Sequence, residues 1–257
     1  DPGTLGCRFR ALPGSAAAGA VHPAGHGGHD FGAPGQFGAA EKEICLRIAA
    51  NVKARLERAA NLADFPLEVQ LSRATDRFIG LRDRVRQANE WGADLFVSVH
   101  ANSSPVPRAR GFEVYFLSNE ATDAEASRVA RQENTESATA PLSPGILSIL
   151  TDLKTNTHIL ESSRFAENVY GSLASLLRPN GKGVRQAPFT VLSGTQMPAL
   201  LIEVGYLTNA EEAQALGRAS YQYRIASGIS DGILGFALRM RRLSSAPTIM
   251  RLGKRTT

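Results

Sequence analysis

The feature that most constrains this chain is the alternation of short strand-like runs with segments of helical periodicity. The strand-like runs occur at residues 67–71, 94–100, 111–117, 189–192 and 199–204. Between them, apolar residues recur every three or four positions, which is typical of helices that bury one face. These helices are expected at residues 41–60, 80–90, 122–133, 165–176 and 225–236. Strands separated by helices of this length predict a three-layer α/β/α fold with a mostly parallel mixed sheet of about six strands flanked by helices.

Composition divides the chain into parts. Gly, Ala and Pro crowd residues 1–40, which predicts loop or tail, and residues 1–20 are expected to be poorly ordered. Residues 21–238 are expected to form one domain. Within it, residues 118–163 are polar and rich in Ser, Thr, Ala and Glu, which predicts an insert over the sheet. Residues 239–257 form a basic C-terminal tail.

The distribution of charge excludes several classes of protein. The formal charge is +5, from 29 Lys and Arg against 24 Asp and Glu, but the tail from Arg239 holds six basic residues and no acidic ones. The rest of the chain is close to neutral and has no basic stripe interleaved with aromatic residues, so nucleic-acid binding is not expected. No run of about 18 apolar residues occurs, so no membrane span is expected.

The cysteines and the N-terminus place few constraints on function. Cys7 and Cys45 permit at most one disulfide and lack the paired spacing of a zinc knuckle. The chain begins at Asp1 without a Met, a basic segment or an apolar run, so a signal peptide is not expected within it. The compartment must therefore be inferred from the function.

Two of the five histidines stand out by their context. His26 lies in the run Ala-Gly-His-Gly-Gly, where small neighbours leave the ring accessible and let the backbone turn tightly. His100 ends the strand-like run DLFVSVH, on the same face as Phe96 and Ser98. Ligands of open α/β sheets bind at the carboxyl ends of strands, so His100 lies where a site is expected.

Two glutamates complete a candidate site. Glu41 opens the first helix directly after the glycine-rich loop, 15 residues beyond His26, so the loop and the helix start can converge. Glu203 lies in the otherwise apolar run ALLIEVG, where an uncompensated carboxylate is costly unless it has a partner or a role. Two histidines, one carboxylate ligand and a second free carboxylate are the groups of a hydrolytic zinc site with an open water position and a glutamate base.

Six motifs in collinear order carry a resemblance to a known family. They are GHGGHDFGAPGQFGAAEK at 25–42, LSRATDRFIGLRDRVRQAN at 71–89, ADLFVSVHANS at 93–103, GFEVYFLS at 111–118, VRQAPFTVL at 184–192 and PALLIEVGYLTNAEEA at 198–213. Over residues 22–238 the chain resembles the zinc-dependent N-acetylmuramoyl-L-alanine amidases, the cell-wall amidases of the AmiC type in the amidase_3 family.

The resemblance implies one Zn²⁺ per chain, with His26, Glu41 and His100 as its ligands. It implies that Glu203 is the catalytic glutamate and that Asn102, in the HAN run, lines the site for substrate. It also implies that four further residues hold strand ends and loops in place: Arg73, Asp76, Arg84 and Asn89.

The chain departs from the family pattern just before His26. Family members read Asp-Pro-Gly-His-Gly-Gly after an aliphatic strand, whereas here Pro-Ala-Gly precedes the histidine. A first strand is therefore not predicted, and the contacts that orient His26 are expected to differ from those of the family. His22 and His29 are not expected to be zinc ligands.

The activity implied by the resemblance is hydrolysis of the amide bond between N-acetylmuramic acid and the L-alanine of the peptidoglycan stem peptide, in cell-wall remodelling or daughter-cell separation. A peptidoglycan substrate implies a periplasmic or extracellular location. In similar amidases of the AmiC type, a helix covers the zinc site until a protein activator displaces it. Residues 118–163 are the corresponding segment, and Glu133 within them is the candidate for an inhibitory fourth ligand.

Two other functions stay open at this point. The same ligands would suit a zinc peptidoglycan endopeptidase, since ligands define the chemistry but not the bond that is cleaved. The altered segment before His26 could instead leave an inactive cell-wall-binding module. The released products separate an endopeptidase from an amidase, and turnover in the presence of bound zinc excludes the inactive module.

Overall fold

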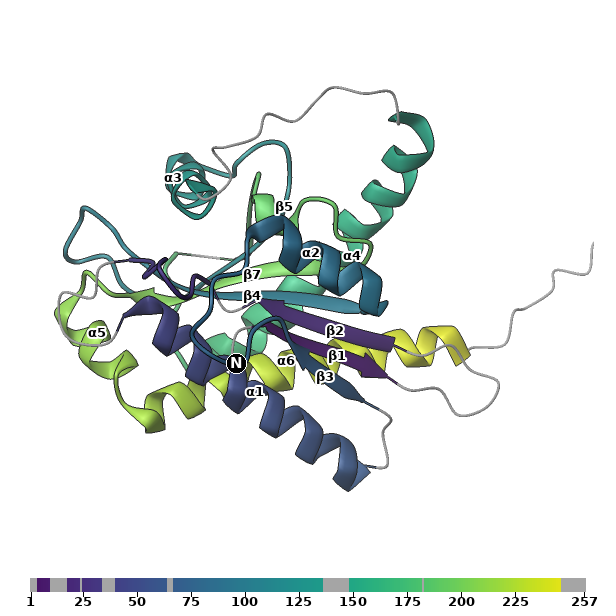
Figure 1. The fold of residues 1–257 in the computed structure, drawn as a ribbon, viewed down its shortest axis with the longest axis horizontal. Helices are drawn as coiled ribbons and strands as arrows, with labels where there is room; N and C mark the ends of the chain where they lie inside the picture. Colours follow the sequence, from purple (N-terminus) through teal and green to yellow (C-terminus); the bar gives the residue numbers. More distant parts are fainter. Residues whose placement is uncertain are drawn as a thin grey trace, which may run out of the picture.

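A computed structural model describes residues 4–9, 18–23, 25–33, 40–63, 67–135, 148–181 and 183–245 (Figure 1). Within these ranges the strands are β1 (Thr4–Phe9), β2 (Ala18–Pro23), β3 (Glu68–Leu71), β4 (Leu95–Asn102), β5 (Glu113–Leu117), β6 (Arg185–Ala187) and β7 (Ala199–Tyr206). The helices are α1 (Glu41–Ala63), α2 (Leu81–Trp91), α3 (Ala124–Glu133), α4 (Ser148–Ala174), α5 (Ala210–Leu216), α6 (Ala219–Ser245) and the 3-10 helix η2 (Thr190–Leu192).

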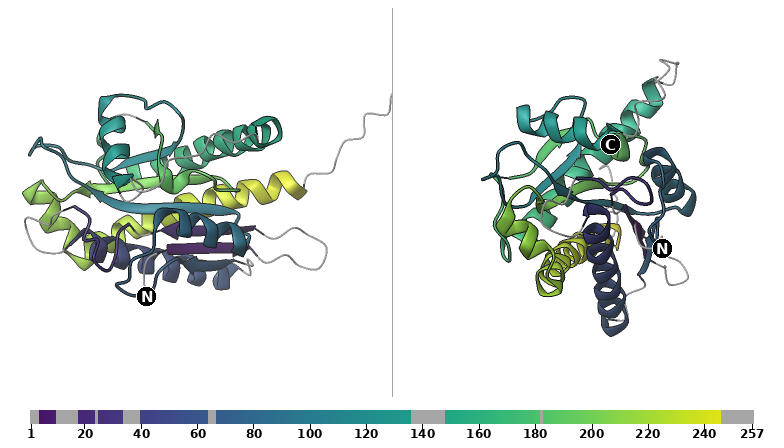
Figure 2. Two further views of the ribbon diagram at one scale, coloured as in Figure 1. Left: turned by 45° about the horizontal axis from the view of Figure 1, so that its top comes forward. Right: turned by 60° about the vertical axis from the view of Figure 1, so that its left-hand side comes forward.

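The strands form one mixed sheet in the order β1-β3-β2-β4-β7-β5-β6. β2 is parallel to β3 and β4, β4 to β7, and β5 to β6. β5 is antiparallel to β7, and β1 is antiparallel to each strand that it contacts. Helices lie on both sides of the sheet (Figure 2). The expected mixed α/β sheet flanked by helices is confirmed, and the described residues form seven strands rather than about six.

Each face of the sheet has its own hydrophobic cluster. Alternate residues of β4, namely Leu95, Val97 and Val99, belong to the cluster that also contains apolar side chains of α1, α4 and α6. Phe96 belongs to the opposite cluster, together with side chains of α2, α3 and η2. The alternation expected for a strand therefore holds along β4, and it places His100 on the Phe96 face.

The N-terminal part of the sheet corrects a prediction. Residues 1–40 were expected to be loop or tail, but β1 and β2 form within them. Their sequences, TLGCRF and AGAVHP, hold few β-branched or aromatic residues and so carry little strand propensity. Pairing of β2 with β4 and of β1 with β2 stabilises these strands instead, and no local sequence pattern reports such pairing.

The strand predicted at 189–192 is wrong, because Thr190–Leu192 form η2 and the neighbouring strand is β6. Phe189, Val191 and Leu192 are buried in the cluster on the α2 face. A helical turn buries the three apolar residues of this four-residue run as well as a strand does, so periodicity over so short a run does not distinguish the two.

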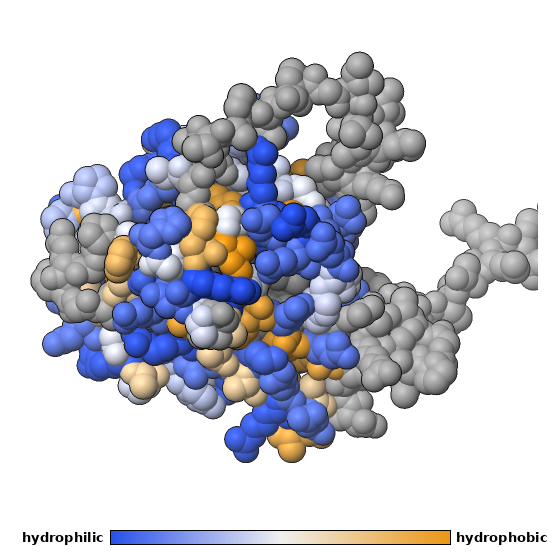
Figure 3. All heavy atoms as spheres, viewed as in Figure 1, coloured by the Kyte–Doolittle hydropathy of each residue, from blue (hydrophilic) through white to orange (hydrophobic). Residues whose placement is uncertain are grey.

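The predicted insert and tail are only partly described. The helix expected at 122–133 is confirmed as α3, and α4 begins inside the segment 118–163. α6 continues to Ser245, beyond residue 239 where the tail was expected to begin, and residues 246–257 lie outside the described part. No helix of the described ranges is long and apolar enough to cross a membrane. The face drawn in Figure 3 is largely hydrophilic, with a group of hydrophobic residues near its centre.

The sheet gathers the candidate site at one edge. β2, β4 and β7 are parallel neighbours, so their carboxyl ends lie side by side. The loop after β2 carries His26, and β4 carries His100, which is paired in register with Glu203 of β7. On the other side of β7, the antiparallel strand β5 places Glu113 opposite Glu203.

Candidate metal centre

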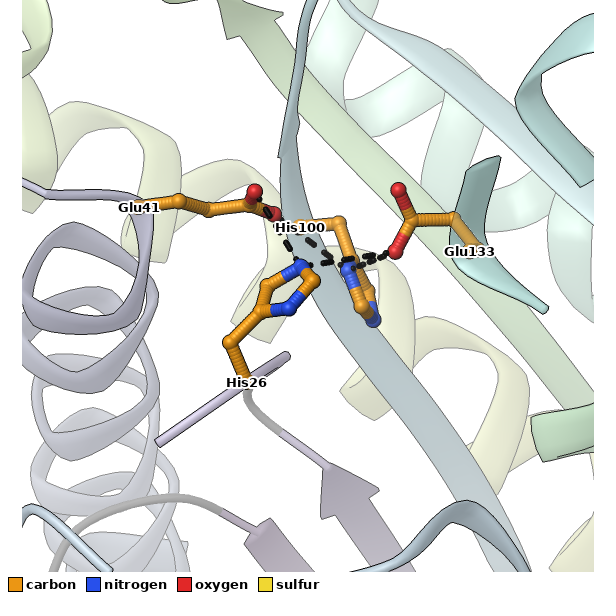
Figure 4. A group of neighbouring side chains, drawn as sticks. All are labelled: His26, Glu41, His100 and Glu133. Carbon is orange, nitrogen blue, oxygen red and sulfur yellow. Dashed lines mark ion pairs between the residues drawn. The ribbon is translucent and has the colours of Figure 1, made fainter. Parts of the chain in front are cut away.

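Four side chains from different elements converge at the carboxyl edge of the sheet. His26 comes from the loop after β2, Glu41 from the start of α1, His100 from β4 and Glu133 from the end of α3. One nitrogen or oxygen of each residue lies within 4.8 Å of the corresponding atoms of the other three. Figure 4 shows the two glutamates approaching the histidine pair from opposite sides. The structure thus brings together the three expected ligands and the candidate fourth ligand, which we call the four-residue cluster.

Glycines allow the loop around His26 to pass directly against the cluster. His26 has a φ of 62°, and among the described residues it is the only non-glycine with a positive φ. A Cβ at Gly25 would lie 2.3 Å from Cε1 of His100, and a Cβ at Gly32 would lie 2.5 Å from Oε2 of Glu41. Both positions therefore need glycine, and the unusual backbone at His26 is held where its side chain joins the cluster.

Two residues that sequence reasoning missed orient the histidines. Oδ2 of Asp30 lies 2.7 Å from Nδ1 of His26. Oγ of Ser98 lies 3.0 Å from Nε2 of His100. Each contact uses one ring nitrogen and leaves the other, Nε2 of His26 and Nδ1 of His100, facing the cluster. The carboxylate that orients His26 thus follows the histidine by four residues, and that short spacing was the available signal.

Glu41 is held in place by backbone donors. Oε2 accepts a hydrogen bond from Ala33 N at 2.7 Å, and Oε1 accepts one from Ala101 N at 2.9 Å. The same two oxygens lie 3.1 Å from Nε2 of His26 and 3.3 Å from Nδ1 of His100. Burial alone would raise the pKa of Glu41, but the charge of His26 and the contacts with both histidines hold that pKa well below its usual range. Glu41 is therefore ionised.

Helix α3 presents Glu133 to the cluster and is fixed at both ends. Asp123 caps its N-terminus by accepting a hydrogen bond from Ala126 N at 2.8 Å. Just beyond its C-terminus, Nδ2 of Asn134 donates to the carbonyl of Pro188 at 2.8 Å, and Oδ1 accepts from Thr190 N at 2.7 Å. Glu133 is only 5% exposed, so its carboxylate faces inward rather than toward solvent.

The carboxylate of Glu133 completes the cluster. Its Oε2 lies 2.6 Å from Nδ1 of His100 and 3.6 Å from Nε2 of His26. Burial alone would raise its pKa, but the charge of His100 and the contacts with both histidines lower it. Two carboxylates and two inward-facing imidazole nitrogens therefore surround one point.

The buried atoms of the cluster fit a zinc ion. Nε2 of His26, Nδ1 of His100 and Oε2 of Glu133 are buried without a hydrogen bond of good geometry, although they lie close together. Burial alone would lower the pKa of both histidines, but the neighbouring carboxylates raise it, so the surroundings favour positive charge there. Imidazole nitrogens and carboxylate oxygens are ligands that zinc accepts in tetrahedral sites.

Glu203 lies beside the cluster without taking part in it. It is fully buried, and neither carboxylate oxygen has a hydrogen-bond partner among the described residues. Burial, followed by the charges of Glu133, Glu41 and Glu113, raises the pKa of Glu203 well above its usual value. Such a carboxyl group can both take and give a proton.

Asn102 does not line the cavity that His26 and Glu133 line; it is buried between two other groups. Its Nδ2 donates to Oε2 of Glu113 at 3.0 Å, and its Oδ1 accepts from Nη2 of Arg128 at 3.0 Å. Arg128 belongs to α3, so Asn102 connects the sheet to the helix that carries Glu133. The role in lining the substrate site stays a prediction.

The four residues expected to hold loops and strand ends make contacts of that kind. Arg73 donates to the carbonyls of Gly25 and Lys42, each at 2.9 Å. Arg84 donates to the carbonyl of His26 at 3.0 Å. The remaining two act nearby: Asp76 accepts from Gly28 N and Lys42 Nζ, and Asn89 bonds to the backbone of Gly194 and Gln196. His29 lies outside the cluster and stacks on Phe78, with 4.4 Å between ring centroids.

Comparison with known proteins agrees with the geometry. The model of the Amidase_3 family, described as N-acetylmuramoyl-L-alanine amidase, matches residues 23–235. The N-acetylmuramoyl-L-alanine amidase AmiA of Escherichia coli strain K12 is 33% identical over 218 residues, which cover 82% of this chain and 73% of that protein.

Solved structures give the same result. The amidase AmiC2 of Nostoc punctiforme is 30% identical with a TM-score of 0.61, covering 84% of this chain and 94% of that structure. The catalytic domain of CwlV, an amidase of Bacillus (Paenibacillus) polymyxa var. colistinus, is 30% identical with a TM-score of 0.58, covering 83% and 94%. The chain belongs to the N-acetylmuramoyl-L-alanine amidase family.

Proposed function

We propose that this member of the amidase family uses one Zn²⁺ to cleave the bond between N-acetylmuramic acid and the L-alanine of the peptidoglycan stem peptide. The observation that carries the proposal is the four-residue cluster with a buried, unpartnered Glu203 in register with His100. His26, Glu41 and His100 would hold the ion. When bound, zinc would act as a Lewis acid that polarises the amide carbonyl and lowers the pKa of water.

Glu203 is the proposed general base and acid. Its pKa is raised and no described residue donates a hydrogen bond to it, so both oxygens are available to a water molecule and then to the departing amine. The carboxylate takes the proton of the attacking water and delivers it to the nitrogen of L-alanine as the C–N bond breaks. A permanently hydrogen-bonded carboxylate in the same place could not exchange a proton so readily.

Glu133 is the proposed inhibitory ligand. It occupies the side of the cluster opposite Glu41, where a substrate carbonyl would otherwise approach (Figure 4). Two contacts hold α3 over the site: Arg128 bonds to Asn102, and Gln132 accepts from Oγ of Ser103 at 3.1 Å. We infer that a protein activator displaces α3, and that Glu133→Ala raises basal hydrolysis without such a partner.

The cellular role follows from the substrate. Cleavage of this amide separates peptides from glycan strands, which serves cell-wall remodelling or daughter-cell separation. Peptidoglycan lies outside the cytoplasmic membrane, so we place the working enzyme in the periplasm or the extracellular space.

The deciding experiment measures zinc content and dye release from labelled peptidoglycan. It compares the wild type with His100→Ala, Glu203→Gln and the matched control His29→Ala, whose ring stacks on Phe78 outside the cluster. Because autoinhibition would mask turnover, the same set is made in the Glu133→Ala background. We expect His100→Ala to lose zinc and activity, Glu203→Gln to lose activity only, and His29→Ala to keep both.

Three results would overturn parts of the proposal. Stoichiometric zinc without turnover in the Glu133→Ala background would favour an inactive cell-wall-binding module. Products other than stem peptides that begin with L-alanine would favour an endopeptidase. Wild-type turnover in Glu203→Gln would remove that residue from the reaction.

A further inference from the structure

A second, larger cavity lies beyond the carboxyl ends of β4 and β7. Its volume is about 1000 Å³, and its lining includes Arg108, Arg110 and Arg178 with a single acidic residue, Glu211. We call this cavity the arginine pocket. Ser104 lines this cavity, and the preceding residue, Ser103, lines the smaller cavity at the four-residue cluster. The two cavities are therefore neighbours along the carboxyl edge of the sheet.

The protein neutralises only part of the charge of the arginine pocket, since the charges of Arg110 and Arg178 act on the buried carboxylate of Glu212 behind the wall. Arg110 is paired with Glu211 at 3.5 Å, but both side chains are well exposed, at 46% and 85%, so the pair is weak. In the part of the chain that the structure describes, Arg108 and Arg178 form no ion pair with a carboxylate. The lining therefore keeps an excess of positive charge, and no described carboxylate holds Arg108 or Arg178 in a direct ion pair.

Backbone contacts hold the segments that carry Arg110 and Arg178 against each other. Gly111 has a φ of +100°, and a Cβ there would lie 2.6 Å from the backbone nitrogen of Asn180. This close approach brings Arg110 and Arg178 together, since Phe112 N also donates to the carbonyl of Arg178 at 3.1 Å. This part of the pocket is therefore preorganised for a ligand.

The loop that carries Arg108 is held in the same way. Ser104 N donates to Oγ1 of Thr208 at 3.0 Å, and Nδ2 of Asn209 donates to the carbonyl of Pro107 at 3.0 Å. Both anchors come from the turn after β7, the strand that carries Glu203. The pocket and the metal centre are therefore fixed to one another through β4 and β7.

We propose that the arginine pocket binds the carboxylates of the acidic stem peptide, which gives the enzyme preference for free acids over amidated peptides. The inference rests on the proposed function. Arginine is suited to this role because its guanidinium group matches a carboxylate with two parallel hydrogen bonds. Ser104 follows His100 by four residues, at most about 14 Å of extended chain, so the second and third residues of a bound peptide come within reach of the pocket.

The test measures binding rather than turnover. The probe is a fluorescently labelled tripeptide, L-Ala-D-Glu-L-Ala, compared with the same peptide carrying primary amides in place of both carboxylates. Dissociation constants are measured for the wild type, for Arg108→Ala/Arg178→Ala and for the control Arg58→Ala/Arg224→Ala. The control removes the same charge from exposed arginines of α1 and α6.

We expect the wild type to bind the acid about tenfold more tightly than the amide, which is the order of one charge-assisted pair. The pocket variant should bind the acid about tenfold more weakly and the amide unchanged, while the control matches the wild type. Equal binding of acid and amide by the wild type would overturn the inference. Unmeasurable binding of the acid, or equal losses in the pocket and control variants, would overturn it as well.

The inference and the proposed function fail separately. If the Glu133→Ala protein hydrolyses peptidoglycan but the wild type shows no preference for the acid in binding, only the inference about the arginine pocket is contradicted. If binding shows an acid preference that depends on Arg108 and Arg178 but the Glu133→Ala protein does not hydrolyse peptidoglycan, only the proposed enzymatic function is contradicted.

Discussion

Glu203 and Glu113 are two buried glutamates that face each other across β7 and β5, yet their surroundings differ completely. Glu113 accepts hydrogen bonds from five side chains: Asn102, Tyr115, Asn180, Arg185 and Tyr206. Glu203 accepts none from the described residues. The first carboxylate is satisfied by its neighbours and so stabilises the fold, whereas the second, without a donor in the described part of the chain, is available for the proton transfer proposed above.

This difference shows why burial alone does not identify a catalytic carboxylate. Both residues lie in apolar runs, GFEVYFL and ALLIEV, and each run would predict a glutamate with a partner or a role. Glu113 has a structural role because β4, β6, β7 and the α4–β6 connection each supply it with a hydrogen-bond donor, and Glu203 receives none from the described residues. Substitution of each glutamate by glutamine separates the two roles by experiment.

The largest effect is expected for Glu203→Gln. Loss of a general base costs roughly 10²–10⁴-fold in rate, and we expect about 10³-fold for peptidoglycan hydrolysis in the Glu133→Ala background. Glutamine fills the same space without a buried charge, so thermal unfolding should show no loss of stability. A fall in the unfolding temperature together with retained activity would place Glu203 with Glu113 as a structural carboxylate.

The opposite pattern is expected for Glu113→Gln. Arg185 lies 2.6 Å from Oε1 of Glu113 with a side chain only 14% exposed, and removing one member of such a pair costs about 3 kcal/mol. Chemical denaturation should show this loss while bound zinc stays the same. Glu113→Gln/Arg185→Met should recover part of it, because the second change removes the unpaired guanidinium. Unchanged stability would contradict the structural role.

A smaller effect is expected for Asn102→Ala, which removes one of the five donors to Glu113. The expected loss is about 1 kcal/mol in the free energy of unfolding. Arg128→Ala is the matched control, because it removes the other hydrogen bond of Asn102 at a partly exposed position and should cost less. A larger loss in the control would mean that Asn102 acts mainly through α3.

The smallest effect concerns pH in the metal-free protein. The pKa of Glu203 is raised above its usual 4.5, so the folded state holds this proton more tightly than the unfolded chain. The wild type should therefore lose stability relative to Glu203→Gln as the pH rises above about 4.5. Unfolding temperatures of both proteins in chelator, from pH 4.5 to 8, measure the difference. A difference that stays flat over this interval would contradict a raised pKa.

Much of the fold and the cluster followed from local sequence signals. Helical periodicity predicted α1, α2 and α6, and the small residues around His26 marked a loop that could approach ligands. Glu133 was a candidate only through the family resemblance, and it reaches the cluster because α3 forms in the predicted insert and ends at that residue.

The remaining features depend on side-chain geometry or on contacts between distant segments. Asp30 and Ser98 lie only four and two residues from the histidines that they contact, and this spacing marks them as candidates without fixing the direction of their side chains. The satisfied state of Glu113 requires Asn180 and Arg185, more than 60 residues away in sequence. Strands β1 and β2 form by pairing with β4 and with each other despite weak propensity.

Asn134 contributes to the threshold at which the proposed inhibition would be released, beside the contacts of Arg128, Gln132 and Glu133. Glu133 can leave the cluster only if α3 shifts or its last turn unwinds, and either movement strains the two hydrogen bonds of Asn134 to the segment before and within η2. Those bonds are together of order 1–3 kcal/mol. Evolution could therefore make the enzyme easier or harder to switch on by substituting one residue that takes no part in zinc binding or hydrolysis.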